Sequence, residues 1–346
     1  MIWAPLILLA SRGADWLPAL GSRFPAVEVL AADALDSPKR APQRDFEFDY
    51  LVTGLAEVDS LSPRFRVFSQ DAHTQHDLAP LVARMLLRLW QINYVEFGLD
   101  HSYRYNHHLI DVYLCQQGDP GGEQFFAYDP DAKTDSDVIF IYDLKSFTDP
   151  VEQAREIAHE YGHATLPPIG GYGNGEPWAN GDAGEVLYMR SLRDALKSHL
   201  LTSDDAMGAD EGGINAWIKQ NADPLLIKAA THSPRALDSK TEDGRDAYLG
   251  WMLYVSALVP PQIWRRIVRL TPTTDAKDFP GTVLDAISES DEEIDLRVPS
   301  QLAERTIWVP LGNRILSGGD LVERQGGWGK VKLASNLALR LAVPRS

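Results

Sequence analysis

Apolar and polar residues alternate through the first half of the chain in patterns that predict both strands and helices. Valine and aromatic residues at alternating positions are typical of half-buried strands. Apolar residues that recur every three or four positions after Asp77 predict a helix that ends at Gly98. The predicted strands are residues 46–53, 65–69, 109–115, 124–128 and 138–142.

A second helix is predicted to begin at Asp149-Pro150, with Asp as the cap and Pro in the first turn, and nothing interrupts it before Pro167-Pro168. Beyond it, the spacing of apolar residues predicts helices over 183–199, 214–218, 224–230, 246–259 and 262–270. The end of the chain changes character, with short strands over 307–309, 321–324, 330–333 and 337–343 and a hairpin turn at 325–329.

These elements predict an α+β fold class and a division into four segments. Residues 1–45 form an N-terminal arm, rich in Pro, Ala and charge, or a residual signal segment. Residues 46–200 form a mixed sheet with two helices, residues 201–303 a mainly helical lobe, and residues 304–346 a β-rich C-terminal segment.

Composition narrows the class of protein. The 346 residues carry a formal net charge of −16, which argues against a nucleic-acid partner because such surfaces need clustered Lys and Arg. The apolar run Ile2–Ala10 is too short to span a bilayer, so an integral membrane protein is not expected. Residues 1–14 are either the remnant of a signal peptide, which would favour an exported or periplasmic location, or a buried first strand. The single cysteine, Cys115, excludes an intrachain disulfide and is expected in the core.

The segment His159-Glu160-Tyr161-Gly162-His163 reads H-E-x-x-H and lies inside the helix predicted after Asp149. A spacing of four places both imidazoles on one face, one turn apart, where both can bind a single ion. Zinc accepts two imidazoles and a carboxylate and keeps a position for water, from which Glu160 can take a proton. The alternative is a surface helix with unrelated histidines.

The motif and the order of elements before it resemble gluzincin-type zinc metallopeptidases. The resemblance covers residues 46–200 and implies a mixed sheet packed on two helices, the second of which carries the motif. It also implies a third zinc ligand, a glutamate on a later helix. Metzincins are excluded because their Gly and His positions hold Leu166 and Ile169. The Asn-Glu pair that opens the ligand helix in thermolysin-like enzymes is replaced by Asn180-Gly181.

Three carboxylates after the motif are candidates for the third ligand. Glu176 precedes Pro177 in a loop and is ranked last. Asp182 and Glu185 could instead form a capping box, which explains Asp182 well and Glu185 less completely. The preferred ligand is Glu185, since Gly184 beside it would allow close approach of the motif helix, and Asp182 is the alternative.

The sequence therefore predicts a zinc-dependent hydrolase, a metallopeptidase that acts on a peptide or protein, with His159, His163 and Glu185 as ligands and Glu160 as general base. The strand Val138–Tyr142 is the expected partner of an extended substrate. His232 and Tyr248 are candidates for an oxyanion donor, although nothing in the local sequence singles out either. The competing hypothesis is a zinc-binding scaffold or interaction protein that cuts nothing. His101 and His107-His108 are expected to form a loop cluster, and the sequence does not determine the oligomeric state.

Overall fold

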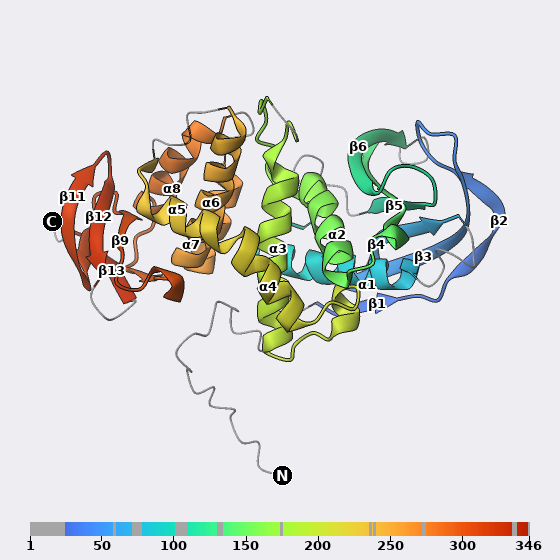
Figure 1. The fold of residues 1–346 in the computed structure, drawn as a ribbon, viewed down its shortest axis with the longest axis horizontal. Coiled ribbons are helices and arrows are strands. Elements are labelled where there is room, and N and C mark those ends of the chain that lie inside the picture. Colours follow the sequence, from blue (N-terminus) through green and yellow to red (C-terminus); the bar gives the residue numbers. More distant parts are fainter. Residues whose placement is uncertain are drawn as a thin grey trace, which may run out of the picture.

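The N-terminal half of the chain builds a mixed sheet that lies at one end of the molecule (Figure 1). The computed structural model describes residues 25–57, 60–70, 78–100, 109–129, 134–173, 176–234, 237, 240–271, 275–333 and 338–344. The strand order is β1-β3-β4-β5-β7-β6, and β2 also pairs with β3. The strands are β1 (Val27–Val29), β2 (Asp33–Arg40), β3 (Glu47–Glu57), β4 (Leu61–Ser69), β5 (Ile110–Cys115), β6 (Gly121–Asp129) and β7 (Thr134–Tyr142).

The sheet combines parallel and antiparallel pairs. Strand β5 pairs in parallel with both β4 and β7, whereas the remaining pairs are antiparallel. Strand β6 pairs with β7 alone and therefore forms one edge of the sheet. This edge faces the helix that carries H-E-x-x-H (Figure 1).

Alternate residues of the central strands pack on opposite faces of the sheet. Val67, Val112 and Ile139 belong to the main core with the helices. On the other face, Tyr113 and Phe140 belong to a smaller apolar cluster that also contains Cys115. Cys115 is fully buried, which confirms its expected position in the core, and burial raises the pKa of its thiol to about 12.

Two helices cover the inner face of the sheet. Helix α1 (Leu78–Ile92) continues as a π turn, Asn93–Phe97, and ends at Gly98, whose φ of 71° is the left-handed conformation that glycine adopts readily. Helix α2 (Pro150–Thr165) begins as predicted, because the Asp149 carboxylate accepts a hydrogen bond of 2.9 Å from the backbone N–H of Val151.

Helix α3 (Ala179–Lys197) packs against α2 at a contact between two glycines. A Cβ atom at Gly184 would lie 2.4 Å from the Cα of Gly162, and one at Gly162 would lie 2.7 Å from the Cα of Gly184. The predicted close approach at Gly184 is therefore confirmed. It places the first turn of α3 directly beside the histidines of α2.

The rest of the chain forms a helical region followed by small sheets (Figure 1). The further helices are α4 (Glu211–Asn221), α5 (Asp223–Thr231), α6 (Glu242–Leu258), α7 (Pro261–Leu270) and α8 (Phe279–Ser288). Two three-stranded sheets, ordered β10-β13-β8 and β11-β12-β9, close the chain. Their strands are β8 (Ile294–Arg297), β9 (Thr306–Pro310), β10 (Ile315–Ser317), β11 (Gly319–Gln325), β12 (Trp328–Leu333) and β13 (Ala338–Ala342).

The expected mixture of helices and strands, with a mixed sheet and a β-rich C-terminal end, is confirmed. The arm expected over residues 1–45 differs, because residues 27–40 form β1 and β2 and hydrogen-bond to β3. The sequence also did not predict α8, β8 or β10. Within the described ranges, none of the helices is both long and apolar enough to cross a membrane. Residues 1–14, His101 and His107-His108 lie outside the described residues.

Candidate metal site

The two histidines of α2 face each other across one helical turn. Their rings lie on the same face of the helix, as the spacing predicts, with centroids 4.8 Å apart. Nε2 of His163 is 3.1 Å from Nε2 of His159. Two zinc–nitrogen bonds at the tetrahedral angle would place the nitrogens about 3.3 Å apart, so the pair already has the separation that one ion requires.

The other nitrogen of each ring contacts an oxygen from α3. Nδ1 of His163 is 3.0 Å from Oδ1 of Asn180, whose own Nδ2 donates to the His163 carbonyl oxygen at 2.9 Å. Nδ1 of His159 is 3.3 Å from Oε2 of Glu185. Since both oxygens are acceptors, each Nδ1 carries the proton in the neutral ring, and the Nε2 lone pairs point at each other. Such an arrangement requires a proton or a cation between them.

Without an ion, a proton shared by the pair meets this requirement. Burial lowers the pKa of His159, but the hydrogen bond to Glu185 and the nearby carboxylates outweigh it and raise the pKa to about 9. Burial and the charge of His159 lower the pKa of His163 to about 4. The pKa of His159 is therefore raised and that of His163 lowered, so His159 holds a proton in preference to His163.

Glu160 lies beside this pair in a buried position. One carboxylate oxygen of Glu160 and one ring nitrogen of each histidine all lie within 4.8 Å of one another. The Oε2 atom of Glu160 is buried and has no hydrogen-bond partner among the residues that the structure describes, and burial raises the pKa of the carboxyl to about 8. Strand β6 approaches this side chain closely because residue 122 is glycine; a Cβ atom there would lie 2.5 Å from Cγ of Glu160.

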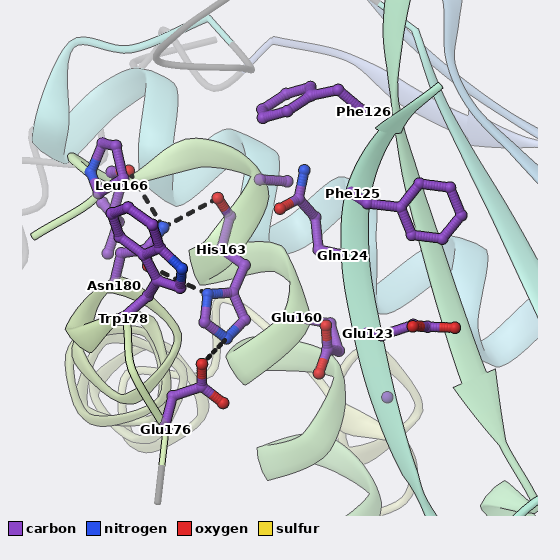
Figure 2. A pocket seen from close by; sticks show the side chains of 13 residues that line it. Glu123, Gln124, Phe125, Phe126, Glu160, His163, Leu166, Glu176, Trp178 and Asn180 are labelled. Atoms are coloured by element: carbon purple, nitrogen blue, oxygen red, sulfur yellow. Dashed lines mark hydrogen bonds and ion pairs between the residues drawn. The ribbon is translucent and has the colours of Figure 1, made fainter. Parts of the chain in front are cut away.

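A cavity of about 730 Å³ opens onto Glu160 and His163 (Figure 2). Strand β6 forms one wall, and the end of α2, the following loop and the start of α3 form the other. The residues that line it are Gly122, Glu123, Gln124, Phe125, Phe126, Glu160, His163, Ala164, Leu166, Pro168, Glu176, Trp178 and Asn180. The position of Val138–Tyr142 differs from the expectation, because β7 lies between β5 and β6 and the strand beside the cavity is β6.

The carboxylate of Glu123 lies at the cavity wall but has a cationic partner. Arg44 donates to both of its oxygens, at 2.6 and 2.7 Å, and the Tyr142 hydroxyl donates to Oε1. This network holds Glu123 against β6 and offsets its charge.

The three carboxylates considered as third ligand occupy different sides of the histidines. Glu185 contacts Nδ1 of His159 and accepts a hydrogen bond of 2.9 Å from Arg155. Asp182 is 3.7 Å from the same Nδ1 and 3.2 Å from Nε of Arg245. Glu176 alone of the three is on the cavity side, with Oε1 3.9 Å from Nε2 of His163.

The capping-box interpretation of Asp182 and Glu185 is wrong. Helix α3 begins at Ala179, four residues earlier than expected, and residue 178 occupies the cap position without a side-chain hydrogen bond. Both carboxylates therefore lie inside the helix and point toward α2 and its cationic neighbours.

Neither candidate for an oxyanion donor lies in the cavity lining. His232 is exposed and its Nδ1 is 2.8 Å from the carbonyl oxygen of Lys228. Tyr248 is buried in the helical region with its ring against Phe279. Sequence reasoning assigned no role to Asn180 or Gly122, although the change from Asn-Glu to Asn180-Gly181 marked the segment as unusual.

No protein-family model matches the chain, and none of the curated proteins matches it significantly. The site must therefore be interpreted from its own geometry.

Proposed function

We propose that this protein is a zinc-dependent hydrolase of gluzincin type that cleaves peptide bonds. The observation that carries the proposal is the pair of Nε2 atoms 3.1 Å apart whose partner nitrogens both contact oxygens of α3. Metal-binding histidines have this arrangement, with the second nitrogen donating to a carboxylate or carbonyl oxygen that fixes the ring. The unpartnered, buried Oε2 of Glu160 beside them also fits a site for an ion and water.

The chain's own residues supply the acid–base chemistry. His159 and His163 would hold the ion, which when bound polarises a carbonyl and lowers the pKa of water. The positive charge of the ion would keep Glu160 ionised despite its burial. The Glu160 carboxylate would then accept a proton from a water whose oxygen bonds to the carbonyl carbon, and would return it to the amide nitrogen as the C–N bond breaks. The acid–base cycle is balanced, because Glu160 gives up the proton that it accepted.

Strand β6 is suited to hold an extended peptide. It is the edge strand of the sheet and forms one wall of the cavity from Gly122 to Phe126. Free backbone groups on a sheet edge pair with an added strand whatever its sequence, while pockets for side chains give selectivity. Ala164, Leu166 and Trp178 line the opposite wall, which favours an apolar substrate side chain there.

A scaffold that binds zinc without cutting remains the competing function. The position of Glu160 favours hydrolysis, because a binding site has no need of a buried carboxylate with an unpartnered oxygen.

The test is cleavage of an unbiased peptide library, read by mass spectrometry, with zinc content measured on the same samples. Glu160→Gln is expected to keep the zinc and lower cleavage by about 10²–10⁴-fold, since an amide cannot accept the proton. Glu323→Gln, the same change at an exposed glutamate of strand β11 outside the cavity lining, is the matched control and should cleave at the parent rate. A zinc-loaded parent protein that cleaves no peptide, or a Glu160→Gln protein at the parent rate, would contradict the proposal.

A further inference from the structure

We infer that the third protein ligand of the metal is Glu176, from the loop after the motif helix, and that Glu185 and Asn180 are positioning residues that orient the two histidines. This inference rests on the proposed function, since it assigns residues to the same ion. It replaces the sequence-based choice of Glu185 for reasons of geometry.

The first reason is the side of the ring that Glu185 contacts. An ion held by both histidines must lie at the facing Nε2 atoms. Glu185 contacts Nδ1 of His159, which lies on the opposite side of the ring. Its Oε2 atom also accepts from Arg155, so the carboxylate is held where it orients His159 and not where it could reach the ion.

The second reason is the residue that α3 presents to the Nε2 atoms. Helix α3 faces the two Nε2 atoms with Gly181. A Cβ atom at this residue would lie 2.2 Å from Nε2 of His163 and 2.6 Å from Nε2 of His159. Any side chain there would collide with the rings or fill the space between them. Helix α3 therefore contributes no ligand at this position, and glycine leaves room for an ion.

The third reason is the placement of Glu176. Its Oε1 atom is 3.9 Å from Nε2 of His163, and it lines the same cavity as Glu160 (Figure 2). Within the described part of the chain, the His163 imidazole is the one basic side chain within 4.0 Å of its carboxylate. The side chain is 33% exposed, so it is not enclosed by packing.

Backbone contacts hold the loop that carries Glu176. Gly170 pairs with Trp178, and Ala179 donates to the carbonyl oxygen of Ile169 at 2.8 Å. Arg245 donates to the carbonyl oxygen of Glu176 at 3.3 Å. These contacts hold the backbone of residues 169–171 and 176–179, so Glu176 is carried close to α2, a position that the sequence alone did not reveal.

The experiment measures zinc affinity by chelator competition and the visible spectrum of the cobalt(II)-substituted full chain. Glu176→Ala is expected to weaken zinc binding by at least about 100-fold and to change the cobalt spectrum, because a water replaces the carboxylate. Glu185→Gln, the matched control, should weaken binding by about 10-fold and leave the spectrum unchanged, as expected for a residue that only orients a ligand. Glu176→Gln, nearly isosteric, separates loss of charge from loss of the side chain, and circular dichroism checks that each variant folds.

A Glu176→Ala protein with parent zinc affinity and an unchanged cobalt spectrum would overturn the inference, whatever Glu185→Gln does. A Glu185→Gln protein with an altered spectrum would also overturn it, while leaving the proposed metal site intact. Failure of the parent protein to bind zinc would instead contradict the proposed function itself, so the two failures are distinguishable.

Discussion

The two halves of helix α3 both bury polar side chains, but only the N-terminal half borders the candidate metal site. In the C-terminal half, Ser191 donates to Glu96 at 2.8 Å and Arg193 donates to Asp194 at 2.8 Å. These groups satisfy one another inside the protein. In the N-terminal half, Asn180 and Glu185 contact one nitrogen of each histidine, and the other nitrogens face each other near the cavity.

The two halves differ in whether the buried polar atoms beside them have hydrogen-bond partners, and not in the amount of buried charge. A buried polar cluster with all partners present stabilises or specifies a fold. A cluster with convergent lone pairs, an unpartnered carboxylate oxygen and access to a cavity can bind an ion or a substrate.

Gly181→Ala should weaken zinc binding at the N-terminal half of α3 without unfolding the protein. The added methyl would lie 2.2 Å from Nε2 of His163, so the rings must move apart or the ion space must fill. We expect zinc affinity to fall by about 100-fold, while the free energy of unfolding without metal changes by no more than about 1 kcal/mol. Gly281→Ala, where a Cβ atom meets nothing within 4 Å, is the control and should bind zinc like the parent. Parent affinity in Gly181→Ala would contradict the placement of the ion.

Gly184→Ala should loosen the contact between α2 and α3 that brings the histidines of α2 beside the polar side chains of α3. A Cβ atom at residue 184 would lie 2.4 Å from the Cα of Gly162, which is backbone that cannot rotate away. We expect a loss of about 1–3 kcal/mol in the free energy of unfolding, the usual result of overpacking. Urea denaturation of the metal-free proteins measures it. An unchanged midpoint would mean that the helices are not held at this distance.

Much of the fold was predictable from the sequence because its signals are local. The cap at Asp149, the apolar stripe of α1 and the hairpin glycines each depend on neighbouring residues. The strands β1 and β2 were missed because their residues are mostly exposed or half-buried and lack a strong apolar alternation.

The candidate site likewise has a part that the sequence predicts and a part that it does not. His159, Glu160 and His163 follow from one short motif on one helix. Which ring nitrogens Glu185 and Glu176 lie nearest depends on the Gly162–Gly184 contact and on the path of residues 166–173 and 176–178. Both are tertiary features. The edge position of β6 likewise depends on strand order, which alternation in one strand cannot reveal.

Glu96→Gln should change the pH dependence of the free energy of unfolding. Glu96 is buried and accepts a hydrogen bond from Ser191 in the C-terminal half of α3. Burial raises the pKa of Glu96 to about 7, against the opposing hydrogen bond from Ser191. Between its ordinary pKa, 4.5, and 7, the folded state keeps a proton that the unfolded state has lost, so the stability contributed by this group falls as pH rises through that window. Glutamine does not titrate, so the free energy of unfolding of the variant relative to the parent should rise by about 2–3 kcal/mol between pH 5 and pH 8.

Urea denaturation at the two pH values measures this change. Ser191→Ala sharpens the test, because loss of its hydrogen bond should raise the pKa of Glu96 further and extend the fall in stability to higher pH. A relative stability of Glu96→Gln that is the same at both pH values would contradict the assignment of Glu96 as a protonated, buried group.

The proposed function depends on one zinc ion bound between the facing nitrogens of His159 and His163. Its most direct test is elemental analysis and zinc affinity of the parent protein beside the His159→Ala/His163→Ala double variant, with circular dichroism to verify folding. The account predicts about one zinc per parent chain and a loss of binding of at least about 1,000-fold in the double variant. A folded parent protein without a transition metal, or equal zinc in the parent and the double variant, would contradict it.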